Sequence, residues 1–394
     1  MSKIVFFCIP AHGHTNPTLG IVRELTGRGH EVWYYSYNSF REVIEAAGAK
    51  FIACDEYDME RRVRPEDTAR IGRDIAFSTH ILVETTLALD DRICKDLERL
   101  QPDCIVADSM AVWGKALALK MGIPFVSSTT TFAFNKESAK IMRQGLGDLF
   151  RMLRAMPKVN RDLKRLQDKG YPIRNILDIL QNDDRTDTIV YTSAQFQPCA
   201  DTFTDKYAFV GPLLREAVET VDKTREKLIY VSLGTVNNDK PRFWQNCVEA
   251  FRDTEYQVIL SVGDLTNLED WKSLPPHISM FRHVDQIAVL SRADVFITHG
   301  GMNSVSESLY YGVPLVLYPQ TAEQNGVTNR VLQLGAGARL RKISPEAIRE
   351  AAEAVLKGPS YRESAARISE GFKQCSGARG AADKIEQVCA QTLS

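Results

Sequence analysis

The chain has 394 residues, which is more than one hydrophobic core usually supports, so two domains are expected. Hydrophobic residues make up 44% and charged residues 25%, which is ordinary for a globular protein. The 49 basic and 50 acidic residues give a formal net charge of -1. This balance offers no electrostatic reason to expect nucleic acid or an anionic membrane as a partner.

Cysteine use and hydropathy indicate the compartment. The eight cysteines are scattered without a C-x-x-C pair, which favours reduced thiols over a disulfide or zinc framework. The chain runs straight into the apolar stretch KIVFFCI without a cleavable signal pattern, and no apolar run reaches membrane-spanning length. We therefore expect a soluble protein of the cytoplasm.

Strand and helix signals alternate through the first half of the chain, which predicts an α/β fold with a doubly wound parallel sheet. After the first strand, the segment PAHGHTNP is expected to be a loop, with a helix from about Pro17 to Arg28. The expected buried strands are Lys3–Ile9, His30–Ser36, Lys50–Cys54, the segment PDCIVADS, the segment PFVSSTT, Thr188–Ser193 and Tyr207–Gly211. The expected helices are Phe40–Ala47, Asp74–Leu100 and Trp113–Met121.

The stretch from Phe132 to Leu180 departs from this alternation, because helical periodicity replaces the strand signal. Its apolar residues can line a pocket for a hydrophobic acceptor, or they can form a helical layer that packs on the sheet. Residues 213–227 are charged and lack an apolar stripe, so they are interpreted as a linker. A second strand–helix series then begins with LIYVSLGT.

The most informative stretch is Ala293 to Gln324, where two buried-strand signals enclose a glycine-rich turn and a short helix. Gly300 and Gly301 allow positive φ and close approach of a ligand, and Asn303 or Ser304 can cap the helix. The amide groups at such a helix N-terminus favour phosphate, and His299 stands beside it. A glycine pair after a strand is a weak signal when it stands alone.

The full set of residues in this stretch is more specific. In order and spacing it resembles the nucleotide-sugar signature of family 1 glycosyltransferases, and the short form HGGMNS resembles the bacterial macrolide-glycosyltransferase branch. The resemblance implies the GT-B fold, with two doubly wound Rossmann-like domains facing across a cleft. The matching residues are His299, Gly301, Asn303, Ser304, Glu307, Gly312, Val313, Pro314, Pro319, Glu323 and Gln324.

This family fold gives the expected domain limits. Residues 1–212 form an acceptor-binding domain, 213–227 the linker and 228–380 a nucleotide-sugar-binding domain. The last helix, 381–394, is expected to follow the break SGARG, and the resemblance implies that it returns to the first domain.

A histidine and an aspartate are the candidate catalytic pair. His14 lies two residues before Asn-Pro, where the family carries its general base, and a carboxylate such as Asp108 would orient it. His12 is assigned a loop or acceptor-side role. From the residues alone, His14 can equally be a loop histidine bonded to backbone, and Asp108 can be the N-cap of the following helix.

The resemblance also implies a donor site in the second domain. Ser232 and Thr235 of SLGT would contact the β-phosphate, although an isolated SLGT is more often a plain turn. His299, Gly301, and the N–H groups around Asn303 and Ser304 would hold the diphosphate and neutralise its charge.

Further residues would hold the ribose and the sugar. Glu307 would accept hydrogen bonds from the ribose hydroxyls, and otherwise it is a solvated helix glutamate. Glu323 and Gln324 match the acidic-Gln pair that holds the sugar hydroxyls, and otherwise they merely begin a helix.

The nucleobase position departs from the family pattern. Plant relatives carry W-x-P-Q, whereas this chain reads His283-Val284-Asp285-Gln286, so His283 would stack on the base with less area. UDP is the family default and dTDP is the alternative. No D-x-D pair lies in a suitable loop, so neither a divalent cation nor a resident cofactor is expected.

These observations predict an inverting, metal-independent UDP-glycosyltransferase. It would move a hexose, with glucose from UDP-glucose as the expected donor, to a hydroxyl of a small lipophilic molecule such as a macrolide or flavonoid. A GT-B nucleotide-sugar epimerase and a non-catalytic nucleotide-sugar-binding protein are the alternatives. The sequence leaves the oligomeric state open.

Overall fold

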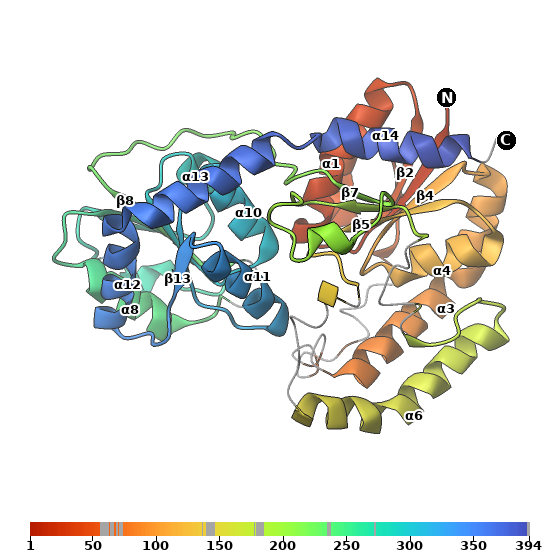
Figure 1. The fold of residues 1–394 in the computed structure, drawn as a ribbon, viewed down its shortest axis with the longest axis horizontal. Helices are drawn as coiled ribbons and strands as arrows, with labels where there is room; N and C mark the ends of the chain where they lie inside the picture. The colour runs from red at the N-terminus through yellow and green to blue at the C-terminus, as the bar shows by residue number, and fades with distance from the viewer. Residues whose placement is uncertain are drawn as a thin grey trace. The chain divides into compact units, whose positions relative to one another are not determined.

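The computed structural model describes residues 1–55, 63, 67, 70, 74–135, 137–138, 146–176, 178, 185–234, 238–271 and 273–391, and side chains from 146 to 153 are not described. These residues form two α/β units (Figure 1). The first unit comprises Met1–Leu213 with Ser376–Ser394, and the second comprises Leu214–Cys375.

The first unit contains a parallel sheet with the strand order β3-β2-β1-β4-β5-β6-β7 in its described part. Short apolar runs between polar turns form these strands, as expected for a sheet that is covered on both faces. The strands are β1 (Lys3–Phe7), β2 (Glu31–Ser36), β3 (Lys50–Ala53), β4 (Cys104–Asp108), β5 (Phe125–Thr129), β6 (Thr188–Val190) and β7 (Tyr207–Phe209).

Helices cover both faces of this sheet, and the central strand β1 shows how. Ile4 and Phe6 join a core with residues of α1 and α14, while Val5 and Phe7 join a core with residues of α3 and α4. Successive side chains of a strand point to opposite faces, so one apolar run serves two cores. The helices are α1 (His12–Gly27), α2 (Arg41–Ala46), α3 (Ile75–Leu100), α4 (Val112–Met121), α6 (Leu146–Asp168) and α14 (Gly377–Ala390), with short 3₁₀ turns η1 (Asn38–Phe40) and η4 (Ala200–Thr202).

The start of α1 differs from the prediction. The segment PAHGHTNP was expected to be a loop, but α1 already begins at His12, with Ala11 as the extended N-cap residue. The reason is that β1 ends at Phe7, and the N–H groups of His14 and Thr15 both bond the carbonyl of Ala11. Pro17 therefore lies inside the helix, where its missing N–H removes one bond near the N-terminal end.

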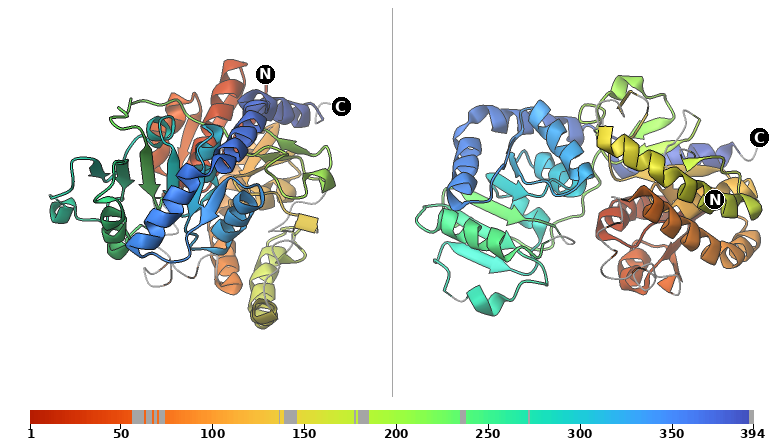
Figure 2. Two further views of the ribbon diagram at one scale, coloured as in Figure 1. Left: turned by 60° about the vertical axis from the view of Figure 1, so that its left-hand side comes forward. Right: turned by 90° about the horizontal axis from the view of Figure 1, so that it is seen from below.

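The helical insertion packs against α3. Helix α6 runs along α3, as the yellow and orange helices in the right panel of Figure 2 show. Val159, Leu163 and Leu166 are at most 2% exposed and lie in the core that contains α3 and α4. For these residues the structure favours a packing layer over a pocket lining. Other apolar residues that contribute to the helical periodicity of this stretch, Met142 and the side chains of Leu149, Phe150 and Leu153, lie outside the described residues.

The C-terminal helix α14 lies beside α1 in the first unit. Its apolar residues Ala381, Ala382, Ile385 and Val388 are buried in the same core as α1. The predicted helix start at 381 was wrong, because SGARG does not break the helix: α14 begins at Gly377. The N–H of Gly377 bonds the carbonyl of Val210, which fixes this entry point.

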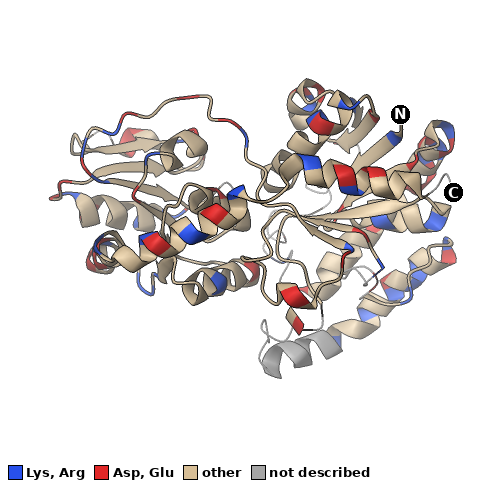
Figure 3. Ribbon diagram, turned by 45° about the horizontal axis from the view of Figure 1, so that its top comes forward, with Lys and Arg blue, Asp and Glu red and all other residues tan. Residues whose placement is uncertain are grey.

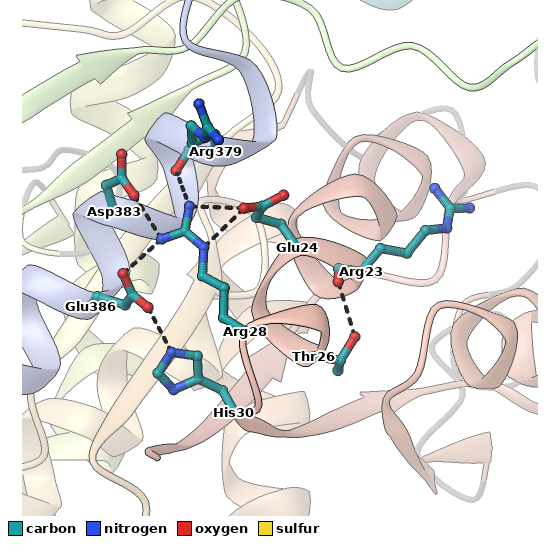
Figure 4. A network of polar contacts seen from close by, with 8 residues as sticks. All are labelled: Arg23, Glu24, Thr26, Arg28, His30, Arg379, Asp383 and Glu386. Atoms are coloured by element: carbon teal, nitrogen blue, oxygen red, sulfur yellow. Dashed lines mark hydrogen bonds and ion pairs between the residues drawn. The ribbon is translucent and has the colours of Figure 1, made fainter.

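A charged network joins α14 to the end of α1 (Figure 4). The Arg28 guanidinium lies 2.7 Å from Asp383 Oδ1, 2.7 Å from Glu386 Oε2 and 2.9 Å from Glu24 Oε1. His30 Nε2 lies 2.7 Å from the other oxygen of Glu386. The hydrogen bonds from His30 and Arg28 lower the pKa of Glu386, because they outweigh its partial burial. Charge and apolar burial thus hold the same helix in place.

The second unit repeats the architecture with the strand order β10-β9-β8-β11-β12-β13. Its core contains the inward residues of these strands together with α8 and α12. The strands are β8 (Leu228–Ser232), β9 (Gln257–Ser261), β10 (Ile278–Phe281), β11 (Val295–Thr298), β12 (Leu315–Leu317) and β13 (Gly337–Arg339). The helices are α8 (Pro241–Phe251), α9 (Gln286–Leu290), α10 (Met302–Tyr310), α11 (Ala322–Gln333), α12 (Pro345–Lys357) and α13 (Pro359–Lys373), with the 3₁₀ turn η5 (Leu268–Trp271).

The segment that was interpreted as a linker is part of the second unit. Its acidic and basic residues, visible along the loop in Figure 3, pair with two aspartates of that unit. Arg215 pairs with Asp285, and Lys223 pairs with Asp294. We call residues 214–227 the connector. The second unit therefore runs from Leu214 to Cys375, where 228–380 was expected.

Across the described residues, no helix has both the length and the apolar character that a membrane span requires.

We expect Arg28→Met to loosen α14. The change removes three carboxylate contacts from a guanidinium whose side chain is 23% exposed, at a cost of about 1–2 kcal/mol for such a network. Amide hydrogen exchange over residues 377–390, followed by mass spectrometry, should become roughly 5–30 times faster. Arg252→Met is the control, because Arg252, which directly follows α8, pairs with Glu249 on the exposed surface. Unchanged exchange in α14, or equally fast exchange in both variants, would contradict this account.

Candidate functional site

Both units place polar residues where the strand order reverses. In the first unit the chain proceeds outward from β1 to β2 and β3, and then returns to β4 on the other side of β1. Ligands of doubly wound sheets bind at such a switch point, beyond the carboxyl ends of the strands. Phe7 pairs with Ala107, so the segments that follow β1 and β4 emerge side by side. His14 and Asp108 lie on these two segments.

The structure brings His14 and Asp108 into direct contact. His14 Nδ1 lies 2.7 Å from Asp108 Oδ2, and Asp108 is only 2% exposed. The second carboxylate oxygen of Asp108 accepts the N–H of Met110 at 2.7 Å. A carboxylate beside Nδ1 favours the tautomer with the proton on Nδ1, which places the basic lone pair on Nε2. This is the geometry of a histidine–aspartate general base.

The structure answers both alternative readings of this pair. His14 is bonded to a buried carboxylate, and Asp108 is not the N-cap of α4, because that residue is Ala111. His12 is exposed, and its ring lies 5.0 Å from the ring of Phe40.

Two neighbours of the dyad were missed by the sequence analysis. Thr130 Oγ1 lies 3.2 Å from His14 Nδ1, and Cys8 Sγ lies 4.0 Å from Asp108 Oδ2. Burial, and to a lesser degree the charge of Asp108, raises the pKa of Cys8, so this thiol stays protonated. Thr130 directly follows β5, which pairs with β4, so the strand order gave a usable signal for it.

The second unit has its switch point between β8 and β11. Thr298 pairs with Ser232, so the turns after these strands adjoin, and the His299 ring lies between two glycines. A Cβ at Gly234 would lie 2.7 Å from His299 Cε1, and one at Gly301 would lie 2.5 Å from Nε2. Only residues without a side chain allow this close approach.

Helix α10 begins beside this ring. Its N-cap residue is Gly301, so the expectation that Asn303 or Ser304 caps the helix was wrong. They occupy the second and third helical positions, because the extended backbone of Gly301 already starts the helix. Gly301 has φ of -64° and supplies no side-chain cap, while Gly300 has φ of +82°. The positive end of α10 has no side-chain cap and is suited to an anionic group.

Burial keeps the imidazole of His299 neutral near neutral pH. It lowers the pKa of His299 to about 4, and Thr298 Oγ1 lies 3.3 Å from Nδ1. The expectation that His299 neutralises a diphosphate by its own charge therefore does not describe the unliganded protein. Near neutral pH it can offer only a neutral N–H donor or a lone pair.

A hydrogen-bonded cluster surrounds Glu307 on α10. Gln286 Nε2 donates to Glu307 Oε2 and lies 3.4 Å from Ser304 Oγ. Gln286 Oε1 accepts the hydroxyl of Tyr230 at 3.1 Å. Burial raises the pKa of Glu307, although the bond from Gln286 acts in the opposite direction. Glu307 is thus a held carboxylate, and the alternative of a solvated helix glutamate was wrong.

The remaining candidates for donor binding are His283, Ser232 and Thr235. His283 is exposed, and its Nε2 lies 2.9 Å from Asp264 Oδ1. Ser232 is 5% exposed, and its hydroxyl accepts the N–H of Gly234 at 3.3 Å. Thr235 lies outside the described residues.

Of the pair Glu323 and Gln324 at the start of α11, Gln324 has a structural role. Gln324 forms a capping box with Thr321, and its Oε1 accepts the N–H groups of Gln320 and Thr321. Only its amide nitrogen remains to contact a ligand. Glu323 is exposed in the same turn.

Within the residues that the structure describes, no group of three or more His, Cys, Asp or Glu side chains is arranged to hold a metal ion.

Comparison with known proteins identifies the class of this chain. Residues 200–374 match the family described as UDP-glucoronosyl and UDP-glucosyl transferase. The chain is 32% identical to NDP-glycosyltransferase YjiC of Bacillus subtilis over 388 residues, covering 96% of this chain and 95% of that protein. It is 28% identical to the oleandomycin glycosyltransferase of Streptomyces antibioticus, covering 98% and 90%.

Solved structures agree. The calicheamicin glycosyltransferase CalG4 superimposes with a TM-score of 0.82 at 28% identity over the full length of both chains. The glycotransferase of kitacinnamycin gives 0.85 at 26% identity over 98% of each chain. Two doubly wound units with these relatives define a GT-B glycosyltransferase. The chain belongs to the family 1, UDP-dependent glycosyltransferases, in their macrolide-glycosyltransferase branch, and it is an enzyme that uses a nucleotide-sugar donor.

The His299 ring should titrate at about pH 4 in NMR spectra of the unliganded protein, with its signal assigned by loss in His299→Gln. The folded pKa lies below the value of about 6.5 of an unfolded chain, so the unfolded state binds more protons between these values. The stability that neutral His299 contributes is complete above about pH 6.5 and is lost as the pH falls toward 4. A ring pKa near 6.5 would contradict the buried placement.

Gly301→Ala should lower the free energy of unfolding by about 1–3 kcal/mol, because the new methyl group would overlap the His299 ring. Backbone strain does not contribute, since φ of Gly301 is -64°. Gly27→Ala is the control: a Cβ there meets nothing within 4 Å. Urea unfolding measures both variants, and equal stabilities would show that the glycine is not needed for ring contact.

Proposed function

We propose that this enzyme is an inverting, metal-independent hexosyltransferase that moves glucose from UDP-glucose to a hydroxyl of a small lipophilic natural product. The observation that carries the proposal is the 2.7 Å contact between His14 and the buried Asp108 at the switch point of the first unit. An acceptor hydroxyl is a weak nucleophile near neutral pH, and such a dyad is suited to activate it.

The proposed reaction is a single displacement. The acceptor oxygen forms a bond to the anomeric carbon of glucose while the bond from that carbon to the β-phosphate oxygen breaks. The hydroxyl proton passes to Nε2 of His14, and Asp108 stabilises the resulting imidazolium. UDP leaves with the electron pair of the broken bond. One attack from the face opposite the leaving group inverts the configuration at the anomeric carbon.

The donor residues act on the leaving group and its nucleoside. The open N-terminus of α10 supplies N–H groups and the positive end of a helix dipole to the diphosphate. Neutral His299 adds a hydrogen bond there, and Ser232 and Thr235 approach the β-phosphate. This arrangement would stabilise the departing charge without a divalent cation.

Recognition of the ribose, sugar and base falls to other groups. The held carboxylate of Glu307 accepts the ribose hydroxyls, while Glu323 and the amide nitrogen of Gln324 contact glucose. His283 stacks on the uracil, and Gln286 lies next to the same site through its bond to Glu307.

The choice of donor and acceptor is supported by the relatives. The family description names UDP-glucosyl transferases, and the relative in Streptomyces antibioticus is named for oleandomycin. A further relative, in Lentzea aerocolonigenes, is 27% identical and is a 4'-demethylrebeccamycin synthase. Both names point to natural products as acceptors. We assign the reaction to the cytoplasm, because all eight cysteines are free thiols.

The proposal predicts that purified protein with UDP-glucose and a panel of macrolides and flavonoids releases UDP and forms products heavier by one hexose. The reaction is assayed in EDTA, where activity should persist. His14→Ala should lower kcat by about 10²–10⁴-fold, because general-base catalysis is lost. UDP affinity, measured by calorimetry, should change less than about twofold, since His14 acts on the acceptor.

His12→Ala is the matched control, because it removes a histidine of the same helical turn that makes no contact with Asp108. It should retain transfer activity. An active His14→Ala together with an inactive His12→Ala would show that the general base is His12 and that the assignment to His14 is wrong. UDP binding by the wild type without turnover of any acceptor would show a nucleotide-sugar-binding protein.

A further inference from the structure

The connector closes around one carboxylate of the second unit. Asp285 Oδ1 accepts the Arg215 guanidinium at 2.6 Å, and Asp285 Oδ2 accepts the backbone N–H groups of Val218 at 2.6 Å and Glu219 at 3.1 Å. Asp285 is 9% exposed. A buried carboxylate needs several donors to remain ionised, and here the connector supplies three of them.

The same carboxylate begins the helix that carries Gln286. Asp285 is the N-cap of α9, and its Oδ1 accepts the N–H groups of Ile287 and Ala288 at 3.2 and 3.3 Å. Burial would raise its pKa, but the bonds from Arg215 and the connector amides outweigh that effect and lower the pKa to about 2. Asp285 is therefore charged at all physiological pH values, and it fixes both the connector and the start of α9.

One residue further on, the chain reaches the donor side. Gln286 is the first helical residue of α9, and its amide donates to Glu307, the proposed ribose ligand. Arg215 is thus connected to Glu307 through its ion pair with Asp285, the peptide bond from Asp285 to Gln286, and the hydrogen bond from Gln286 to Glu307. Helix α9 has only five residues, so its N-terminal contacts fix much of its position.

Electrostatics link the same groups. Burial raises the pKa of Glu307, and the charge of Arg215 lowers it while that of Asp285 raises it. Tyr230 of β8 and Tyr311 after α10 also face Glu307, and its charge helps to raise the pKa of each. Removing Arg215 would leave the negative charge of Asp285 near Glu307 without the opposing charge of Arg215.

We propose that Arg215 is a positioning residue for donor binding, which acts through Asp285 and Gln286 to hold the Glu307 carboxylate in place for the ribose hydroxyls. The proposal rests on the ribose role given to Glu307 above. It makes the connector part of the donor site's framework. Because coupling is reciprocal, a nucleotide bound at Glu307 also stabilises the contact between residues 215–219 and Asp285.

The other end of the connector offers a matched comparison. Lys223 Nζ lies 2.5 Å from Asp294 Oδ2, and Asp294 is 5% exposed. Asp294 precedes β11 and also accepts the N–H of Leu228 at 2.8 Å and pairs with Arg362 at 3.2 Å. Lys223 therefore ties the same connector to the same unit through a buried aspartate, but without a hydrogen-bonded route to Glu307.

The test compares Arg215→Met with Lys223→Met in the full-length enzyme. Arg215→Met should raise the KM for UDP-glucose and the Kd for UDP about fivefold, the lower end of typical coupling, since its side chain is 44% exposed. The kcat at saturating donor should stay within about twofold, because no reacting atom is touched. Lys223→Met should leave all three values within about twofold, and Arg215→Lys, which keeps the charge, should remain near the wild type.

The pH dependence of UDP affinity distinguishes this positioning role from a general loosening of the connector. Loss of Arg215 raises the pKa of Glu307 further, so the acid-side fall in UDP affinity should begin at a higher pH in Arg215→Met than in the wild type or in Lys223→Met. Equal losses in the two methionine variants, or an unshifted profile with unchanged Kd, would overturn the proposal.

These failures are distinct from a failure of the proposed function. If wild-type protein binds no UDP, or if Glu307→Ala binds UDP as the wild type does, the donor site itself is wrongly assigned. If the wild type binds UDP, Glu307→Ala does not, and Arg215→Met is unchanged, only the role of Arg215 falls.

Discussion

The parallel pairing of β1 with β4 and of β8 with β11 is the constraint on which the rest of the structure depends. In each unit these two strands are neighbours in the sheet but separated in the chain, so the polar segments after them emerge together. The first pairing brings His14 to Asp108, and the second brings the glycine of SLGT to His299. Apolar strand residues that touch no ligand therefore determine where the chemical groups meet.

Burial then decides the charge of the groups that meet there. His299 loses its proton because the site is shielded from water, while Asp285 remains charged because five donors surround it. A diphosphate at α10 would consequently be held by helix amides and a neutral imidazole. Preorganised dipoles of this kind need little rearrangement when charge develops on a leaving group. The same shielding makes Glu307 sensitive to every charge nearby.

The sequence predicted the architecture well, because strand periodicity and glycine stops are local signals. The strands predicted for the first unit, the extent of α3 and the direct contact of His14 with Asp108 agree with expectation, whereas β13 was not among the expected strands. Boundaries set by tertiary contacts were missed: α1 begins at His12 and α14 at Gly377, since their first turns bond Ala11 and Val210. The lowered pKa of His299 is caused by burial, which arises from tertiary packing, and no local sequence pattern reports it.

The connector shows why composition alone misassigned a segment. Residues 214–227 are charged and lack an apolar stripe, which is typical of a solvated linker. Their charges, however, are matched to two aspartates whose own burial would be costly without them. Asp285 is the N-cap of α9, and Asp294 directly precedes β11. The two aspartates therefore bind the connector at two separate points. The connector has no core of its own, and its contacts with these two aspartates hold it in place. One of the two, Asp285, is next to Gln286, which donates a hydrogen bond to Glu307.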